Sequence, residues 1–393
     1  MAAAPSTPPP RDVSHAPVIV RAASLRTIAI PSMIRSPSCV STCPRRRPSA
    51  PRSMFASASF RPPLDRQQFM VRNRFARPIQ VAIAAWMCVA GAFGADEPEV
   101  VGRHEDNIYQ LTFSPDGRWL ATASGDDTAV LWDFQTRKPH VTLTHNGPVY
   151  SAVFAPDGKR LVTGCGDGHV TVWSVPDGRQ LAAIKQHEDA VYIVAFSPDG
   201  KRLASGGGNG GGGDTVCRIW NTEDWTVLHR LEGHTMPIYG VAFSPDGTLL
   251  ASTSRDRTVR LWRLDDGSNR VLEGHTSDVY RSGFSPDGRW LATASQDATV
   301  RVWDVASGQC RATLPGRRDP IYGAVFSPDG LLLAAVGDDC RLRLWQVPEF
   351  TPVFEERMAR EALFALTFSN DGKQILVGGE DTSIYLHRLQ DDP

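Results

Sequence analysis

The sequence predicts an all-β protein, a single seven-bladed β-propeller, and three observations support this fold class. A four-residue turn sequence occurs seven times, its copies stand about 42 residues apart, and segments of alternating apolar and polar residues surround each copy. A period of about 40–45 residues is typical of propeller blades, in which one repeat forms one four-stranded antiparallel sheet. Alternation with a period of two residues predicts strands rather than helices.

The repeated turn reads Ser-Pro-Asp-Gly in five copies and Ala-Pro-Asp-Gly or Ser-Asn-Asp-Gly in the other two. Proline fixes φ, the aspartate side chain bonds to its own backbone and glycine tolerates a positive φ, so this combination predicts a tight turn between two strands. The copies occupy residues 114–117, 155–158, 197–200, 244–247, 285–288, 327–330 and 369–372. Only the interval after the third copy is clearly longer, because it contains a glycine-rich insert at 206–213.

The fifth copy shows how four strands fit into one repeat. Alternating segments at 279–284 and 290–295 flank its turn, and two more follow at 299–303 and 311–314. The seventh copy has only three such segments, but residues 99–103 precede the first copy and align with a fourth-strand segment. We therefore expect residues 99–103 to complete the last blade and close the ring, which leaves no open sheet edge on the inside.

The third segments of the first and fifth copies end in Trp132-Asp133 and Trp303-Asp304. With these dipeptides and this period, residues 99–393 resemble the tryptophan-aspartate (WD-40) repeat family. In that family a His before the first strand, a Ser or Thr on the second, an Asp in the next turn and a Trp on the third lock each blade. The resemblance implies a structural lock in five blades: His104, Thr122, Asp126, Trp132; His145, Thr163, Asp167, Trp173; His187, Ser205, Asp214, Trp220; His234, Ser252, Asp256, Trp262; and His275, Thr293, Asp297, Trp303.

The last two blades depart from this pattern. The corresponding residues are Arg317, Ala335, Asp339 and Trp345 in the sixth blade, and Ala359, Val377, Asp381 and His387 in the seventh. Because a complete polar lock satisfies the buried donors and acceptors that it contains, blades without it should be the least stable.

Two sets of residues are candidates for contact with a partner. An aromatic side chain follows the residue that opens each first strand, and the family resemblance places this register at the top mouth of the central channel: Tyr109, Tyr150, Tyr192, Tyr239, Tyr280, Tyr322 and Phe364. These rings could be a recognition surface or could fill the space between blades, since aromatic residues serve both purposes. The residue before each turn Asp is glycine in the first three blades and then Arg255, Gln296, Asp338 and Glu380, so the top face should be asymmetric.

Charge narrows the class of partner. Residues 1–94 contain 13 Arg, no Lys and only two acidic residues, which leaves 29 of the 42 basic and 41 of the 43 acidic side chains in the rest of the chain. This negative balance argues against nucleic acid, whose phosphates attract positive surfaces, and favours a basic protein or peptide. The seven cysteines show no zinc-ligand spacing, and no catalytic motif stands outside the repeat, so we expect no metal, no cofactor and no enzyme activity.

The N-terminal region has a different composition. Residues 1–69 are rich in Pro, Ser, Ala and Arg, and we expect them to be disordered or a misassigned extension. Residues 70–94 combine a basic start, an apolar run too short for a stable membrane span and small residues before an acidic segment, which is the layout of a secretory signal peptide. The propeller then occupies residues 95–393, either exported or, if the opening is an organelle transit peptide, inside the cell or an organelle.

From these observations we expect a monomeric, non-enzymatic scaffold that binds a protein or peptide on its top face. The alternative is an extracytoplasmic propeller that binds a small ligand, a sugar or a cation, through its aromatic ring. A propeller hydrolase has least support, because it needs His or carboxylate side chains converging on the channel.

Overall fold

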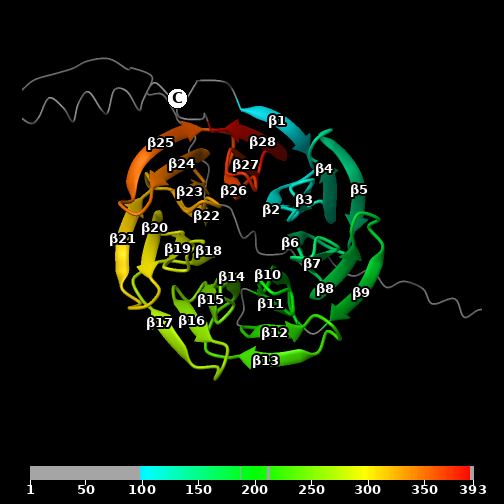
Figure 1. Cartoon of the computed structure of the whole chain (residues 1–393), viewed down its shortest axis with the longest axis horizontal. Coiled ribbons are helices and arrows are strands. Elements are labelled where there is room, and N and C mark those ends of the chain that lie inside the picture. The colour runs from blue at the N-terminus through cyan, green and yellow to red at the C-terminus, as the bar shows by residue number, and fades with distance from the viewer. Residues whose placement is uncertain (1–97, 186, 210–212, 390–393) are drawn as a thin grey trace, which may run out of the picture. The chain divides into compact units, whose positions relative to one another are not determined.

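A computed structural model describes residues 98–185, 187–209 and 213–389, which all lie within one compact unit. In this part of the chain all regular structure is strand, and seven four-stranded antiparallel sheets surround a central axis (Figure 1). The predicted seven-bladed propeller is therefore confirmed. The described residues include no helix that is long and apolar enough to cross a membrane. The predictions for residues 1–69 and 70–94 lie outside the described residues.

Within each blade the strands follow one another from the channel to the outer rim. Blade 1 consists of β2 (Ile108–Phe113), β3 (Trp119–Ser124), β4 (Thr128–Asp133) and β5 (Lys138–Thr144), and blade 2 of β6 (Val149–Phe154), β7 (Arg160–Cys165), β8 (His169–Ser174) and β9 (Gln180–Lys185). Blade 3 consists of β10 (Val191–Phe196), β11 (Arg202–Gly207), β12 (Cys217–Asn221) and β13 (Val227–Leu231), and blade 4 of β14 (Ile238–Phe243), β15 (Leu249–Ser254), β16 (Val259–Arg263) and β17 (Asn269–Leu272). Blade 5 consists of β18 (Val279–Phe284), β19 (Trp290–Ser295), β20 (Thr299–Asp304) and β21 (Cys310–Pro315), and blade 6 of β22 (Ile321–Phe326), β23 (Leu332–Gly337), β24 (Arg341–Gln346) and β25 (Thr351–Arg357).

Blade 7 closes the ring. It combines β26 (Leu363–Phe368), β27 (Gln374–Gly379) and β28 (Ser383–Arg388) with β1 (Glu99–Arg103), which pairs antiparallel with β28. In Figure 1, β1 lies outside β28, so one blade holds strands from both ends of the described chain. The sequence prediction for residues 99–103 is confirmed.

The seven repeated turns connect the first and second strands of each blade. Their glycines have φ between 67° and 74°, as the turn requires: Gly117, Gly158, Gly200, Gly247, Gly288, Gly330 and Gly372. In the fifth copy the Ser285 hydroxyl donates to Asp287 and accepts from the backbone N–H of Trp290, at 2.9 Å for the latter. The side chains therefore bond within the turn as the Ser-Pro-Asp-Gly pattern predicts.

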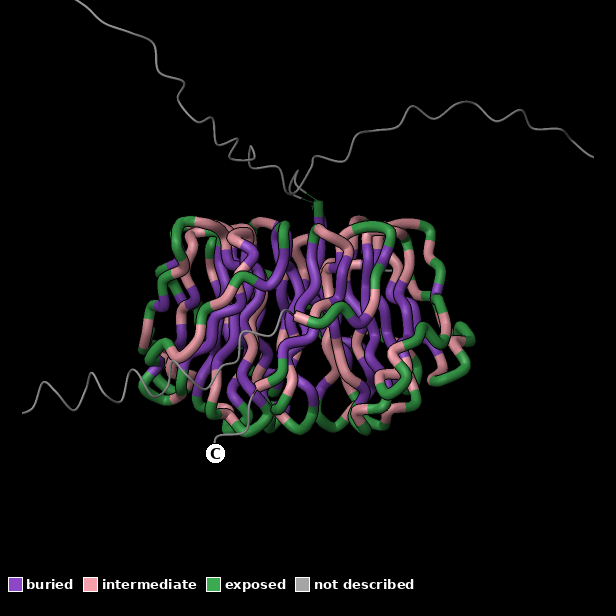
Figure 2. Tube along the Cα trace, turned by 90° about the horizontal axis from the view of Figure 1, so that it is seen from above, coloured by how far each residue is buried: buried purple, intermediate pink, exposed green. Residues whose placement is uncertain are grey.

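The core lies between neighbouring blades. Trp290 and Val302 of blade 5, for example, belong to the same buried apolar cluster as Leu333 and Trp345 of blade 6. Buried residues concentrate in the interior of the ring, while exposed residues mark the loops at both ends and the rim (Figure 2). Because each blade buries its faces against its two neighbours, the stability of one blade depends on the next.

Candidate functional site

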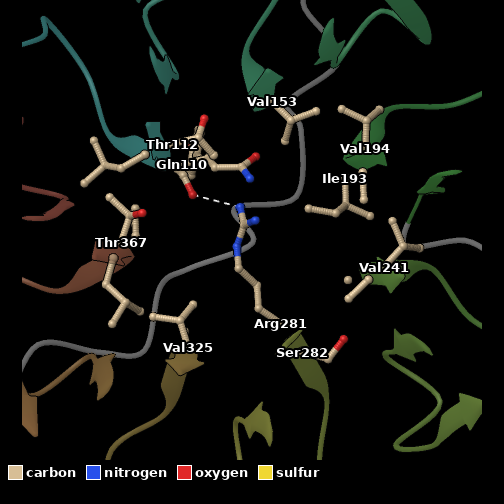
Figure 3. A pocket seen from close by; sticks show the side chains of 18 of the residues that line it. Gln110, Thr112, Val153, Ile193, Val194, Val241, Arg281, Ser282, Val325 and Thr367 are labelled. Carbon is tan, nitrogen blue, oxygen red and sulfur yellow. Dashed lines mark hydrogen bonds between the residues drawn. The ribbon is translucent and has the colours of Figure 1, made fainter. Parts of the chain in front are cut away.

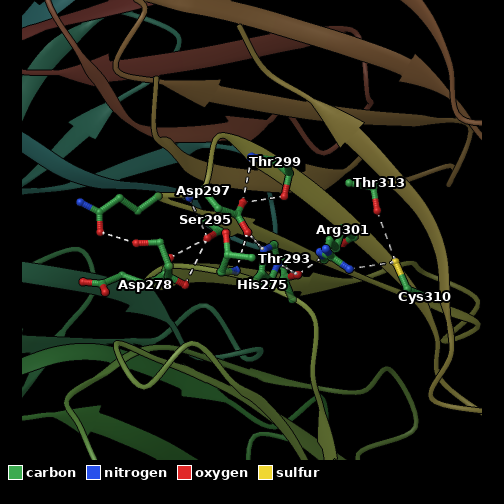
Figure 4. A network of polar contacts seen from close by, with 12 residues as sticks. His275, Asp278, Thr293, Ser295, Asp297, Thr299, Arg301, Cys310 and Thr313 are labelled. Carbon is green, nitrogen blue, oxygen red and sulfur yellow. Dashed lines mark hydrogen bonds and ion pairs between the residues drawn. The ribbon is translucent and has the colours of Figure 1, made fainter. Parts of the chain in front are cut away.

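The hydrogen-bond lock is seen most simply in blade 5 (Figure 4). His275 contacts Asp297 through Nδ1 at 2.8 Å and Thr293 through Nε2 at 2.8 Å. The Trp303 indole N–H donates to the same Thr293 hydroxyl at 2.9 Å. Asp297 also accepts from the backbone N–H of Thr276 and Thr299, each at 3.0 Å. The lock thus joins the loop before β18 to β19, β20 and the turn between them.

These bonds also set the charge of the lock aspartates. Burial alone would raise the pKa of Asp297, but hydrogen bonds from His275 and Thr299 outweigh burial and hold that pKa well below the usual range. The same balance, with His234 as the main donor, lowers the pKa of Asp256 in blade 4. The carboxylates are therefore committed to structure and are not poised for proton transfer near neutral pH.

Blades 1, 3 and 4 repeat this geometry. Their His side chains lie 2.7–2.8 Å from the turn Asp and 2.6–2.7 Å from the Ser or Thr of the second strand, and each Trp bonds to that hydroxyl. The sets are His104, Asp126, Thr122 and Trp132; His187, Asp214, Ser205 and Trp220; and His234, Asp256, Ser252 and Trp262.

Blade 2 departs from the lock that the resemblance implied. His145 contacts Thr163 at 2.8 Å, and Trp173 donates to that hydroxyl at 2.9 Å, but His145 Nδ1 lies 3.1 Å from the carbonyl oxygen of Leu143 rather than beside Asp167. Asp167 instead lies 3.0 Å from His169 Nδ1. Blade 2 also differs in sequence at this point, because His169 follows the aspartate by two residues, where blades 1, 4 and 5 have a threonine whose hydroxyl donates to the aspartate.

Blades 6 and 7 keep the turn aspartate but give it a different partner. Arg343 forms an ion pair with Asp339, and the Tyr385 hydroxyl donates to Asp381 at 2.8 Å. Each partner stands four residues after its aspartate, on the third strand of the blade. The sequence analysis missed these two contacts, and the signal that could have found them is an arginine or tyrosine at that spacing in the two blades without a lock histidine.

The seven aromatic residues form a closed ring around the channel mouth. Centroids of neighbouring rings lie 5.0–6.1 Å apart, so every member contacts the next: Tyr109, Tyr150, Tyr192, Tyr239, Tyr280, Tyr322, Phe364 and back to Tyr109. Tyr322 and Phe364 are buried, whereas the other five are half-buried. The geometry therefore combines both interpretations of this register, since the rings pack between blades and five of them keep accessible surface.

The tyrosine hydroxyls are held neutral. Burial raises the pKa of Tyr239 to about 12, and it raises the pKa of Tyr150, Tyr192 and Tyr280 further above the usual value. Neutral phenols at the mouth can donate or accept hydrogen bonds, which suits recognition of polar groups on a partner.

The pre-turn residues surround this ring. Arg255 lies 3.7 Å from Asp278, Gln296 accepts from the Ser277 hydroxyl at 3.0 Å, and Asp338 lies 3.4 Å from the Tyr322 hydroxyl. Burial raises the pKa of Tyr109, and the negative charge of Glu380 also raises it. In blades 1 and 2 a Cβ at Gly125 or Gly166 would lie 3.4 Å from the ring of Tyr109 or Tyr150, so glycine there leaves the tyrosine edges uncovered.

A cavity of about 330 Å³ lies in the channel, lined by residues of the innermost strands (Figure 3). Arg281 of β18 extends into it and donates from Nη2 to the carbonyl oxygen of Tyr109 at 2.8 Å. Sequence reasoning missed Arg281, although the signal was present. The position after each ring residue is otherwise Gln110, Ser151, Ile193, Gly240, Gly323 or Ala365, so Arg281 is the one charged residue in that register.

The described residues contain no group of three or more His, Cys, Asp or Glu side chains placed to hold a metal ion. Their four cysteines, Cys165, Cys217, Cys310 and Cys340, are free thiols. Burial raises the pKa of Cys165 and Cys217 to about 12, which keeps both as inert thiols.

A closed ring of seven four-stranded blades, with a His–Ser/Thr–Asp–Trp lock in most of them, defines a WD-repeat β-propeller. The family model described as "IFT122 first beta-propeller" matches residues 148–392, and the model described as "WD domain, G-beta repeat" matches residues 99–133. The first model covers more than half of the chain, so the chain belongs to this family of WD-repeat β-propellers. A search of the curated proteins found no match. Propellers of these families are typically non-enzymatic scaffolds.

Proposed function

We propose that this propeller is a non-enzymatic scaffold that binds a protein or peptide at its top face. The observation that carries the proposal is the ring of aromatic side chains, five of them half-buried, with Arg255, Gln296, Asp338 and Glu380 around one side of it. Large aromatic surfaces beside polar groups are typical of the residues that contribute most to binding energy at interfaces.

Charge around the mouth supports a basic partner. Exposed or half-buried carboxylates precede the innermost strands of several blades: Glu105, Asp106, Glu188, Asp189, Asp278, Asp319 and Glu361. Complementary charge accelerates association and orients the partner, and salt weakens both effects. Binding of a basic partner should therefore fall as the salt concentration rises.

A small cation or sugar stacked on the aromatic faces has less support. The rings of Tyr109 and Phe364 stack at an interplanar angle of 24°, and those of Tyr239 and Tyr280 at 29°. Neighbouring rings thus cover faces that a cation cage would turn toward the channel.

The test is affinity capture with the full chain and a variant that carries Tyr150→Ala and Tyr239→Ala, both half-buried positions. A control variant carries Leu181→Ala and Leu228→Ala, two exposed residues on the outer strands β9 and β13. We expect a partner that the parent and the control capture and the tyrosine variant loses, with circular dichroism showing that all three are folded. Equal capture by the folded tyrosine variant would contradict the proposal.

We further propose that residues 70–94 direct export of the protein and are then removed. The support is the three-part layout of this segment in the sequence. The mass of the mature N-terminus, measured on protein from its native cells, should correspond to a chain that begins at residue 95 or 96. A chain that retains residues 70–94 would contradict export by this route.

A further inference from the structure

We propose that the channel below the aromatic ring is a binding site for a carboxylate with an aliphatic body, and that Arg281 holds the carboxylate. The inference does not depend on the top-face proposal, because a small acid can occupy the channel without contacting the mouth. The two sources of this chemistry are a free short-chain aliphatic acid and the C-terminal carboxylate of a peptide that ends in an aliphatic residue.

Arg281 is the one charged side chain among the described residues that line the cavity. Figure 3 shows it extending from β18 across the cavity toward β2, the strand that carries Gln110 and Thr112. Its Nη2 lies 2.8 Å from the carbonyl oxygen of Tyr109 and 3.5 Å from that of Tyr150. The guanidinium thus donates to neutral backbone oxygens, and the described residues that line the cavity include no carboxylate to balance its charge.

A cation in such a place is energetically unfavourable. Burial lowers the pKa of Arg281 to about 10, although the group remains protonated at neutral pH. An anion that entered the cavity would be attracted by an unbalanced charge in a low dielectric, and a guanidinium matches a carboxylate in a two-pronged geometry. The main reason to assign an anion to this cavity is that no carboxylate among its described lining residues balances the charge of Arg281.

The blades on either side of Arg281 have glycine in the same register. Blade 4 has Gly240 and blade 6 has Gly323, so neither neighbouring blade places a side chain at this register position. A Cβ at Gly240 would lie 2.6 Å from the carbonyl oxygen of Tyr280 and 3.2 Å from the Cα of Arg281. The close approach of β14 and β18 therefore requires glycine at this position.

The remaining lining determines the class of anion. Val153, Ile193, Val241 and Val325 give the cavity aliphatic walls. The Ser282 hydroxyl is buried and has no hydrogen-bond partner among the described residues. One guanidinium with one unused hydroxyl suits a singly charged carboxylate, whereas a phosphate dianion needs more donors. The volume of about 330 Å³ is at the small end of ligand pockets, which limits the ligand to a short chain.

The competing explanation is that Arg281 is only a structural strut between blades 5 and 1. The two explanations differ in a measurable way. We would titrate the full chain with hexanoate by isothermal calorimetry up to millimolar concentration, with 1-hexanol as the uncharged probe. The variants are Arg281→Met, which removes the charge at nearly the same length, and Arg263→Met as the matched control, because Arg263 is exposed and pairs with Asp265 at the surface.

We expect saturable hexanoate binding to the parent and to Arg263→Met, about tenfold or more weaker binding to Arg281→Met, and equally weak binding of 1-hexanol to the parent. Absence of hexanoate binding to the parent, or unchanged binding to folded Arg281→Met, would overturn the proposal. If Arg281→Met does not fold, Val325→Phe provides the test, because it keeps Arg281 and fills the cavity from β22. Hexanoate binding that survives Val325→Phe would equally overturn the proposal.

A second arm distinguishes the two sources of the carboxylate. A short peptide ending in valine, with a free C-terminus, is added in competition with hexanoate, and its C-terminal amide is the control. Competition by the free acid and not by the amide assigns the site to a peptide C-terminus, and absence of competition by either assigns it to a free acid. The variant with Tyr150→Ala and Tyr239→Ala should bind hexanoate whether or not it still captures a top-face partner. The two proposals can therefore fail separately.

Discussion

Blades 1, 3, 4 and 5 differ from blades 6 and 7 in how they hold the same turn aspartate. The first group uses a histidine from the loop before the blade, as His234 does for Asp256 at 2.7 Å. In blades 6 and 7 the partner comes from the third strand of the same blade, as Tyr385 does for Asp381 at 2.8 Å. The difference teaches that the carboxylate in the turn is the shared feature, while its side-chain partner can be exchanged.

Blade 3 contains both solutions at once. Asp214 lies 2.8 Å from His187 Nδ1 and also accepts from Arg218 Nη1 at 2.6 Å. Arg218 stands four residues after the aspartate, as Arg343 and Tyr385 do in blades 6 and 7. The two partners are therefore geometrically compatible, and a blade can lose its histidine without leaving the carboxylate unpaired.

The middle of the lock also differs. Where blade 4 has Ser252 bonded to His234 and Trp262, blades 6 and 7 have Ala335 and Val377, both fully buried. These residues belong to apolar clusters that join each blade to its neighbour. Packing thus replaces a buried hydrogen-bonded hydroxyl in these two blades.

The largest expected effect comes from removal of the strand that completes blade 7. Deletion of residues 98–103 exposes the edge of β28 and removes Val101 from the core. We expect loss of cooperative urea unfolding, measured by tryptophan fluorescence and circular dichroism. The control is Arg388→Gln, which removes only the exposed ion pair to Glu99 and should change the midpoint little. A deletion variant with the parent's unfolding curve would show that blade 7 does not need β1.

The next test compares the lock aspartates of the two groups. Asp256→Ala leaves the buried His234 without its acceptor, and we expect a loss of about 3 kcal/mol in the free energy of unfolding. Asp381→Ala in blade 7 removes a bond to a partly exposed tyrosine, for which we expect about 1 kcal/mol. Chemical denaturation of both variants measures the difference. Equal losses would mean that the two solutions are energetically equivalent.

A smaller effect is expected in blade 6. Asp339 is nearly buried, and Arg343→Met removes its ion-pair partner. This loss should lower the free energy of unfolding by about 2 kcal/mol. Arg263→Met is the matched control, because its pair with Asp265 lies at the surface and should contribute less than about 0.5 kcal/mol. The midpoints of thermal or urea unfolding measure the stability losses of both variants. If Arg263→Met were as destabilised as Arg343→Met, the buried and the surface ion pair would contribute equally.

The smallest effect concerns His387, which takes the tryptophan position in blade 7. Its Nε2 is buried with no hydrogen-bond partner among the described residues, and burial lowers its pKa. As the pH falls, His387 therefore takes up a proton at higher pH in the unfolded chain than in the folded protein. The folded protein loses stability as the pH falls from about 6.5, the pKa of histidine in the unfolded chain, toward the lower pKa of folded His387. His387→Phe should add about 1 kcal/mol near neutral pH and weaken this loss.

This prediction is checked by the free energy of unfolding measured between pH 8 and pH 5. Burial also lowers the pKa of His145 and His187, so part of the pH dependence should remain in the variant. A parent and a variant with identical pH profiles would show that His387 does not contribute.

The repeats explain which features the sequence could predict. The turns, the strands and the lock partners of blades 1, 4 and 5 depend on residues at fixed offsets within one copy, so each copy supports the others, and blade 3 differs only by the length of its insert. The contact between Asp167 and His169 was missed because one substitution next to the turn changes a local competition. Arg281 was missed because its surroundings depend on several blades converging at the axis, which spacing along the chain does not describe.

The pairing of β1 with β28 has a consequence for how the ring is made. Glu99 and Leu386 are partners at opposite ends of the described chain, so among the described strands β1 leaves the ribosome first and β28 last. Strand pairing over such a separation is slow, because the ends of a long loop must meet before any contact forms. Until β28 has been synthesised, β1 has no strand to pair with. The six completed blades then form an open arc whose two end faces are apolar and exposed. Chaperone dependence during synthesis is the expected result.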